Sequence, residues 1–229
     1  IRACISAGVK VGLRFTITQD NVDDISGIFS LLEREKIPRI CFYHLVSSGR
    51  AAELAEHDLP HEQTRKCVDL IIDSTDALHK RGYPAEVLTV DNHADGVYLY
   101  QRMVRERSPR AEMVMELLRM NGGNNTGIGI GCVSWDGSVY PDQFWRHHKL
   151  GNVRERPFGE IWSDKSEPLL VQLRDRKALL KGKCGRCVYK DICNGNFRVR
   201  AEAKYRQLWE QDPACYLTEA EISGNFCQE

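Results

Sequence analysis

The chain of 229 residues carries 32 basic and 32 acidic side chains, so its formal net charge is zero. A neutral chain shows no sign of the basic surface that binds nucleic acids or anionic membranes, and no apolar run approaches the ~20 residues of a membrane-spanning helix. We therefore expect neither a nucleic-acid partner nor a membrane partner.

The beginning of the chain has neither an initiating Met nor the features of a signal peptide. Residues 1–10 lack the basic start, the long apolar core and the small-residue cleavage site of a secreted protein. They have the pattern of a helix interior. We therefore expect a cytoplasmic protein, of which this chain is a fragment.

Predicted strands alternate with predicted helices in the first half. Residues 9–18 alternate apolar and polar side chains at period two, which predicts a strand, and residues 21–36 carry a helical stripe of apolar side chains. A buried strand over 39–46, a helix over 61–82 and a strand over 85–90 follow. Connections of this length between strands require parallel pairing, so this half predicts part of an α/β domain.

The pattern changes after two further predicted helices, over 96–107 and 110–120. A glycine-rich joint leads into a short hairpin that turns at Asp136-Gly137, and then into one or two short helices. We place a domain boundary near residue 120, with one domain over 1–120 and a second over 121–229.

Nine cysteines are many for a chain without a secretion signal. An odd count and uneven spacing argue against a complete set of disulfides and favour a reducing compartment with a metal site. Cys4, Cys41 and Cys67 lie singly in apolar or helical segments, so we expect them to be core thiols.

The strongest signal for chemistry is the spacing Cys184-x2-Cys187-x5-Cys193, with Cys215 as the next cysteine along the chain. Four thiolates can hold a structural zinc ion or an iron–sulfur cluster. Basic side chains surround the cysteines and suit either centre, so spacing alone leaves both open. Cys227 is a spare candidate for the fourth ligand.

Two other places carry candidate binding residues. The segment 141–152 contains Arg146, His147 and His148 beside Phe and Trp, which could line a site for a large flat anion or form an anchored surface loop. Arg14 lies on the polar face of the first predicted strand. If that face lines a barrel, its guanidinium needs an anion such as a carboxylate; otherwise it faces solvent.

The cysteine spacing, the hairpin before it and the late cysteine together resemble the SPASM extension of radical S-adenosylmethionine (radical SAM) enzymes. Residues 141–162 and 193–222 resemble the tetrapyrrole-modifying branch, most closely that of haem d1 biosynthesis, with the alternative sirohaem-dependent haem pathway as a near relative. The resemblance covers essentially the whole chain. It implies an α/β fold: the C-terminal part of a partial radical SAM (β/α) barrel, followed by a small cysteine-rich SPASM-like or twitch-like α+β domain.

The resemblance also implies a reduced set of metal ligands. Asp142 and Phe197 stand where the seven-cysteine SPASM pattern has cysteines, and Cys132 is left without partners. One auxiliary [4Fe–4S] cluster is therefore expected, on Cys184, Cys187, Cys193 and Cys215; Asp142 as an oxygen ligand is the minor alternative. The C-x3-C-x2-C loop that binds the S-adenosylmethionine cluster does not occur, so we expect it upstream and expect this chain alone to be inactive.

For the intact enzyme the resemblance implies S-adenosylmethionine, a second [4Fe–4S] cluster and an electron donor such as flavodoxin or ferredoxin. The implied substrate is a sirohaem-type tetrapyrrole, which loses two propionates in the haem d1 branch, whereas two acetates become methyls in the alternative branch. Arg14 would contact S-adenosylmethionine, and Arg146, His147 and His148 would meet the macrocycle. A peptide-modifying SPASM maturase and a structural zinc module are the alternatives.

Overall fold

The computed structural model describes residues 1–226. Its first half is built on a parallel sheet of three strands in the order β1 (Leu13–Thr16), β2 (Arg39–Tyr43) and β3 (Glu86–Val90). The register pairs Leu13 with Ile40 and Ile40 with Val87. The helices of this half are α1 (Arg2–Ser6), α2 (Ile25–Arg34), α3 (His61–Lys80), α4 (Ala94–Arg105) and α5 (Ala111–Asn121), with short 3-10 turns η1 (Val22–Asp24), η2 (Gly49–Ala52) and η3 (Ala55–His57).

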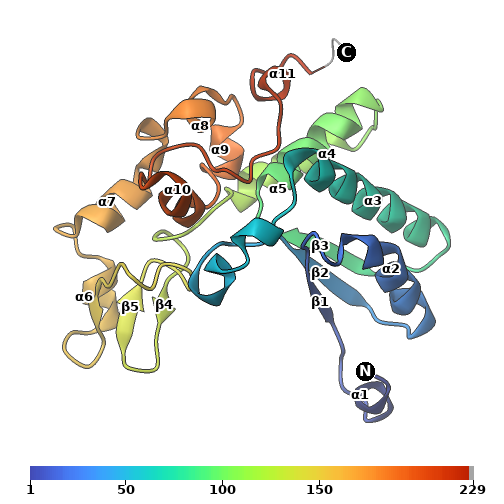
Figure 1. The fold of residues 1–229 in the computed structure, drawn as a ribbon, viewed down its shortest axis with the longest axis horizontal. Coiled ribbons are helices and arrows are strands. Elements are labelled where there is room, and N and C mark those ends of the chain that lie inside the picture. Colours follow the sequence, from blue (N-terminus) through green and yellow to red (C-terminus); the bar gives the residue numbers. More distant parts are fainter. Residues whose placement is uncertain (227–229) are drawn as a thin grey trace.

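One face of this sheet is covered by α2 and α3, which Figure 1 shows together beside the strands. Phe29 and Leu32 of α2 and Ile71 of α3 pack with Ile40 and Phe42 of β2 in one apolar core. The alternation of β1 turns Leu13 and Phe15 towards this core and leaves Arg14 exposed on the opposite side. The uncovered face is therefore the polar one.

The first strand is shorter than the period-two pattern over 9–18 predicts. It pairs only over Leu13–Thr16, because its neighbour β2 begins at Arg39 and pairs from Ile40 onwards. Residues before Leu13 have no partner strand among the described residues, and alternation of side chains alone cannot reveal where a partner ends.

The second half holds an antiparallel sheet of three very short strands, β4 (Cys132–Val133), β5 (Ser138–Tyr140) and β6 (Gly151–Asn152). The predicted hairpin is present, and Gly137 has a φ of +85°, which glycine adopts without strain. The sequence did not predict β6, since two residues are too few for a period. Short helices complete this half: α6 (Phe158–Trp162), α7 (Pro168–Arg174), η4 (Arg176–Ala178), α8 (Gly182–Arg186), α9 (Lys190–Cys193), α10 (Arg198–Tyr205) and α11 (Glu219–Ile222).

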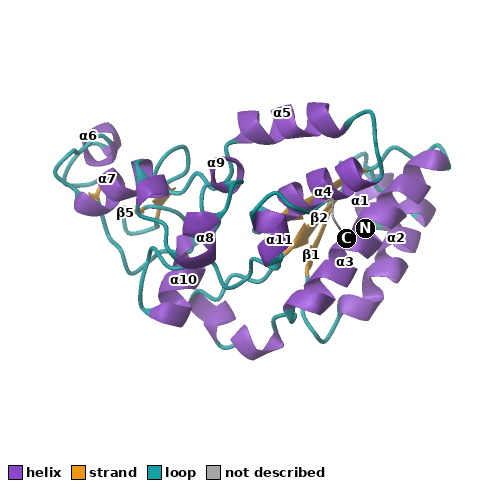
Figure 2. Ribbon diagram, turned by 90° about the horizontal axis from the view of Figure 1, so that it is seen from above, coloured by secondary structure: helices purple, strands orange, loops and turns teal. Residues whose placement is uncertain are grey.

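The two halves share an apolar core. Helix α5 contacts both α4 and α9, and Figure 2 shows it along one edge of the molecule between them. Val97 and Met115 of the first half pack with Ile192 and Leu217 of the second. Helix α5 ends at Asn121 and is followed by Gly122, whose φ of +70° is typical of a glycine that terminates a helix.

Within residues 1–226, none of the helices combines the length and the apolar character that crossing a membrane would require.

Candidate functional site

Four cysteine side chains line one small cavity between the two halves. Cys184 lies in α8, Cys187 directly after α8, Cys193 at the end of α9 and Cys215 in the loop before α11. The rest of the lining is partly apolar and partly polar: Ala94, Val97, Leu217 and Ile222, with Lys183, Tyr189 and Asn196. The three cysteines that the spacing grouped, and the fourth that followed them, are thus brought together.

Backbone turns make this convergence possible. The chain turns sharply after Cys193, because Asn194, Gly195 and Asn196 all have positive φ values, of 52°, 75° and 58°. Glycine and asparagine tolerate this left-handed conformation better than other residues do. On the other side of the joint, Gly123 approaches so closely that an added Cβ would lie 2.3 Å from the carbonyl carbon of Cys193.

Hydrogen-bond donors point at the sulfur atoms. The backbone N–H groups of Tyr189 and Asp212 donate to Cys187 Sγ and Cys184 Sγ, both at 3.4 Å, and Arg198 Nη2 lies 3.8 Å from Cys184 Sγ. Such donors stabilise thiolates. Burial acts in the opposite direction: it raises the pKa of Cys187 and Cys193, and it raises the pKa of Cys215 to about 12. Enclosed thiols of this kind become thiolates when metal ions bind them, so the donor set fits a metal centre.

The distances between the sulfur atoms bear on whether the cavity suits a zinc ion or an iron–sulfur cluster. A tetrahedral zinc ion with Zn–S bonds of about 2.3 Å holds its sulfurs roughly 4 Å apart. Among the described residues, the one group of three or more His, Cys, Asp or Glu ligand atoms within 4.8 Å of one another is His147, His148 and Glu202. No three of the four cysteine sulfurs therefore lie this close to one another, whereas a zinc tetrathiolate would hold all four within that range.

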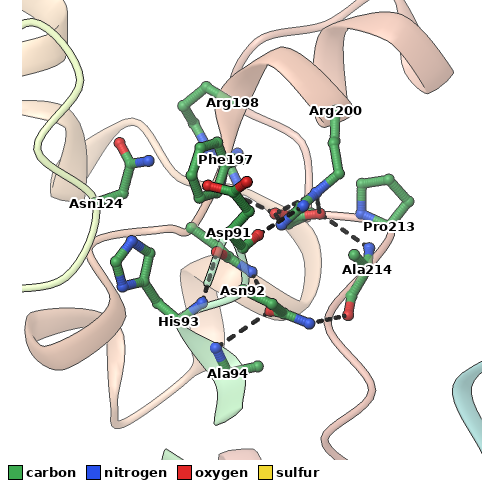
Figure 3. A network of polar contacts seen from close by, with 12 residues as sticks. Asp91, Asn92, His93, Ala94, Asn124, Phe197, Arg198, Arg200, Pro213 and Ala214 are labelled. Carbon is green, nitrogen blue, oxygen red and sulfur yellow. Dashed lines mark hydrogen bonds and ion pairs between the residues drawn. The ribbon is translucent and has the colours of Figure 1, made fainter. Parts of the chain in front are cut away.

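Asp212 organises the loop that carries Cys215. Its carboxylate accepts hydrogen bonds from the N–H groups of Phe197 and Ala214, both at 2.9 Å, and pairs with the guanidinium of Arg200 at 2.9 Å. Arg200 also donates to the carbonyl oxygen of Leu45, after β2, at 3.3 Å. It donates to the carbonyl oxygen of Asp91, after β3, at 2.7 Å (Figure 3). The cysteine loop is thereby anchored to the carboxyl ends of the parallel strands.

The side-chain amides of Asn92 and Asn196 form a second polar connection to the loop that carries Cys215. Asn92 Nδ2 donates to the carbonyl oxygen of Ala214 at 3.1 Å, and Asn196 Nδ2 donates to Asn92 Oδ1 at 2.7 Å (Figure 3). Sequence reasoning missed Arg200, Asp212 and these amides. The Asp212-Pro213 dipeptide before Cys215 is a turn signal that could have pointed to the loop, whereas nothing local marks Arg200.

Asp142 and Phe197, which stand at the missing cysteine positions, are both used by the fold. Asp142 accepts hydrogen bonds from Thr126 Oγ1 at 2.6 Å and from the N–H groups of Phe144 and Trp145 at 2.8 and 3.0 Å. Phe197 packs against Trp145 and makes an edge contact with Phe144. Asp142 does not line the cysteine cavity, so it is poorly placed as a ligand of a metal centre there. Cys132 lies in β4 outside the cysteine cavity, and Cys227 lies outside the described residues.

The remaining predicted site residues lie in two places. The Arg14 guanidinium stacks on the ring of Tyr43, 4.4 Å from its centroid, on the uncovered face of the parallel sheet. Arg146 stacks on the exposed Trp135 and donates to Ser134 Oγ at 2.5 Å, so it belongs to the hairpin. His147 and His148 both contact Glu202 of α10, which sequence reasoning did not single out.

A cleft of about 690 Å³ lies between the loop after β2 and the C-terminal segment. Its lining includes His44, His61, Arg200, Lys204 and Arg206. A smaller hollow of about 340 Å³ shares Ser47, Ala203 and Arg206 with it and reaches His147 and Glu202. His147 therefore faces a cavity next to the cleft, whereas Arg146 lines neither.

Known proteins match both halves. A family model described as SPASM, an iron–sulfur cluster-binding domain, matches residues 129–188. Fe-coproporphyrin III synthase of Methanosarcina barkeri is 60% identical over 222 residues, which cover 96% of this chain and 56% of that protein. Pre-heme d1 synthase of Dinoroseobacter shibae is 37% identical over 224 residues, covering 96% and 55%. AdoMet-dependent heme synthase of Nitratidesulfovibrio vulgaris is 29% identical over 216 residues, covering 91% and 54%.

Solved structures share the fold. Native anSMEcpe with bound AdoMet superposes with a TM-score of 0.62 at 16% identity, over 97% of this chain and 55% of that chain. Streptococcus suis SuiB bound to its precursor peptide SuiA gives a TM-score of 0.65 at 17% identity, over 94% and 47%. The predicted fold class, a partial radical SAM barrel followed by a SPASM-like domain, is confirmed.

These findings define a protein with an iron–sulfur-binding SPASM domain attached to the α/β sheet of a radical SAM fold. The haem and coproporphyrin synthases that match the chain over 91–96% of its length are radical SAM/SPASM enzymes. The chain spans about half the length of the curated relatives it matches, 56% and 55% of the first two.

Proposed function

We propose that the chain is the C-terminal part of a radical SAM enzyme that removes carboxylate side chains from a sirohaem-derived tetrapyrrole. Cys184, Cys187, Cys193 and Cys215 would hold one auxiliary [4Fe–4S] cluster. The observation that supports this assignment is the convergence of the four thiols in one cavity, with N–H donors on their sulfurs. When bound, such a cluster supplies or accepts single electrons.

The identity of this chain to two relatives bears on which side chains the enzyme removes. Identity of 60% to Fe-coproporphyrin III synthase against 37% to pre-heme d1 synthase favours the branch in which acetate groups are removed. The haem d1 branch, with loss of two propionates, is the second candidate, because the sequence motifs resemble it. S-adenosylmethionine, a second [4Fe–4S] cluster bound upstream, and a flavodoxin or ferredoxin donor complete the proposed enzyme.

The chain's own residues would bind and orient the substrates. Arg14, on the polar face of the sheet, is suited to hold the carboxylate of S-adenosylmethionine. Lys204 and Arg206 offer cations at the mouth of the cleft to the many carboxylates of the macrocycle. Arg200 is less suited to this role because Asp212 already neutralises it. His147 and His148 remain candidates for meeting the macrocycle, and Arg146 would act only through the hairpin.

A reducing compartment suits this set of free thiols, so we propose a cytoplasmic protein. The two alternatives have weaker support. The wide spacing of the thiols disfavours a structural zinc module. A peptide substrate is supported only by the likeness to peptide-bound SuiB and anSMEcpe, which at 17% and 15% identity concerns the fold alone.

The test is a reaction of the full-length enzyme under anaerobic conditions. With S-adenosylmethionine, a reductant and didecarboxysirohaem, we expect a product that has lost its two remaining acetate side chains, as detected by mass spectrometry. Loss of propionates instead would assign the haem d1 branch. A fully clustered enzyme that cleaves S-adenosylmethionine without changing either tetrapyrrole would contradict the proposed substrate class.

A further inference from the structure

Two neighbouring imidazoles share one carboxylate at the surface of the second half. Glu202 Oε2 lies 2.9 Å from His147 Nε2, and Glu202 Oε1 lies 2.8 Å from His148 Nε2. One ligand atom from each residue lies within 4.8 Å of the other two, and no other such group occurs among residues 1–226. We propose that His147, His148 and Glu202 bind a divalent transition-metal ion. This site is separate from the cysteine cavity and does not depend on the proposed reaction.

The geometry is close to that of a bound ion. Zinc binds imidazole nitrogen and carboxylate oxygen at about 2.0–2.2 Å, which places tetrahedral ligand atoms roughly 3.3 Å apart. The two observed contacts are only a few tenths of an ångström shorter. The rings are held side by side, with centroids 4.5 Å apart, so both nitrogens already converge on the same carboxylate. Entry of an ion would replace two hydrogen bonds by three metal–ligand bonds with little movement.

The charges and the solvent exposure of the three side chains also favour a bound metal ion. One carboxylate can balance only one imidazolium, whereas an ion uses both rings as neutral ligands. The side chains are 57% exposed at His147, 30% at His148 and 21% at Glu202, so ions can reach the site from solvent while the carboxylate stays largely covered. Two imidazoles and one carboxylate are typical ligands for zinc and for non-haem iron(II).

Three protein ligands leave a coordination position open, as in catalytic rather than structural zinc sites. The hollow of about 340 Å³ beside His147 and Glu202 is also lined by Arg206, which forms no ion pair with a described acidic residue. An oxygen anion, such as a carboxylate, would suit both the open position and this cation. The iron of a tetrapyrrole fits less well, because its axial positions lie on opposite faces and cannot take three converging ligands.

The probe is Zn²⁺ added to the full-length enzyme after its iron–sulfur clusters have been reconstituted. Equilibrium dialysis should show one zinc ion bound beyond any held by the clusters. X-ray absorption should show nitrogen and oxygen ligands at about 2.0–2.1 Å and no sulfur at about 2.3 Å. Glu202→Gln and His148→Ala should each weaken zinc binding by roughly tenfold or more.

His57→Ala is the matched control, because His57 Nδ1 lies 2.6 Å from Asp20 Oδ2 at an exposed site without a third ligand. It should leave zinc affinity unchanged. The iron content and unfolding midpoint of Glu202→Gln without zinc establish that the variant is folded. Sulfur ligands on the zinc, or equal affinity in Glu202→Gln, would overturn the proposal. So would the absence of zinc binding together with a His147-dependent Soret shift of an iron tetrapyrrole, since the imidazole would then be an axial ligand.

Discussion

Arg200 and Asp212 form a fully buried ion pair, with 2.9 Å between Arg200 Nη2 and Asp212 Oδ2 and side chains 2% and 0% exposed. Burial alone would raise the pKa of the Asp212 carboxyl, but the guanidinium outweighs it and the pKa is lowered overall. The pair joins the carboxyl ends of β2 and β3 to the loop that carries Cys215. It is therefore the main polar link between the parallel sheet and the cysteine cavity.

Removing the charge of Asp212 should lower the free energy of unfolding substantially. Asp212→Asn keeps the shape of the side chain but leaves the Arg200 guanidinium buried without a counter-ion, so we expect a loss of about 3–5 kcal/mol in the free energy of unfolding. Urea titration under anaerobic conditions measures this loss. Glu33→Gln, in the exposed pair with Arg81, is the control and should change stability little. Equal losses in the two variants would show that the buried pair has no special role.

Replacing the fourth thiol should remove the auxiliary cluster. In Cys215→Ser the iron content of the reconstituted full-length enzyme should fall by about four atoms per chain. Cys132→Ser should leave iron unchanged, because Cys132 lies in β4 outside the cavity. Iron analysis and low-temperature electron paramagnetic resonance provide the readout. Loss of the cluster in Cys132→Ser but not in Cys215→Ser would mean that the ligand set is wrong.

Gly123 and Gly122 form a matched pair for testing the approach of the joint to Cys193. Both have a φ of +70°, so alanine suffers the same backbone strain of about 1–2 kcal/mol at either position. Only at Gly123 would the new Cβ meet backbone, 2.3 Å from Cys193 C and 2.4 Å from Ile192 O. Gly123→Ala should therefore lose more stability than Gly122→Ala.

Gly123→Ala and Gly122→Ala also test whether the close approach to Cys193 affects retention of the iron–sulfur cluster. Because the clash displaces the backbone of Cys193, Gly123→Ala should also retain less iron after gel filtration, whereas Gly122→Ala should retain it fully. If the two variants behave alike in both measurements, the close approach does not constrain the cluster site.

Asp91 should make stability fall as the pH rises. Burial is the main reason that its pKa is raised to about 6; Arg200, His44 and Arg14 lower it and Asp142 raises it further. An unfolded aspartate has a pKa of about 3.9, so the folded state binds more protons between these values and loses stability as the pH rises through them. Asp91→Asn should thus be more stable than the wild type by about 1–3 kcal/mol at about pH 7.5 and equal to it near pH 4.

Asparagine also tolerates the φ of +68° at this position, so the substitution does not strain the backbone. Unfolding curves of the two proteins across this pH range give the difference directly. A difference that does not change with pH would mean that Asp91 is not protonated preferentially in the folded state.

Local sequence patterns predicted most of the longer helices and strands and the resemblance to the family. Alternation in 9–18 and the helical stripe in 21–36 identify their elements because side chains repeat every 2 or 3.6 residues whatever they pack against. The spacing of Cys184, Cys187 and Cys193 predicts a metal-binding segment for a similar reason: chelation by nearby thiolates is a local geometry. The ends of β1 and the presence of β6 were not predictable, because they depend on partner strands elsewhere in the chain.

The amino-acid sequence by itself determined the α/β pattern, the cysteine cluster and the loss of cysteines at Asp142 and Phe197. Only the tertiary structure decided that Cys215 meets the other three thiols, that Arg200 and Asp212 hold its loop, and that Glu202 joins His147 and His148. The physical reason is distance along the chain. His147 and Glu202 are separated by 55 positions, and neither has a local signature, so only the folded backbone brings such groups within bonding range.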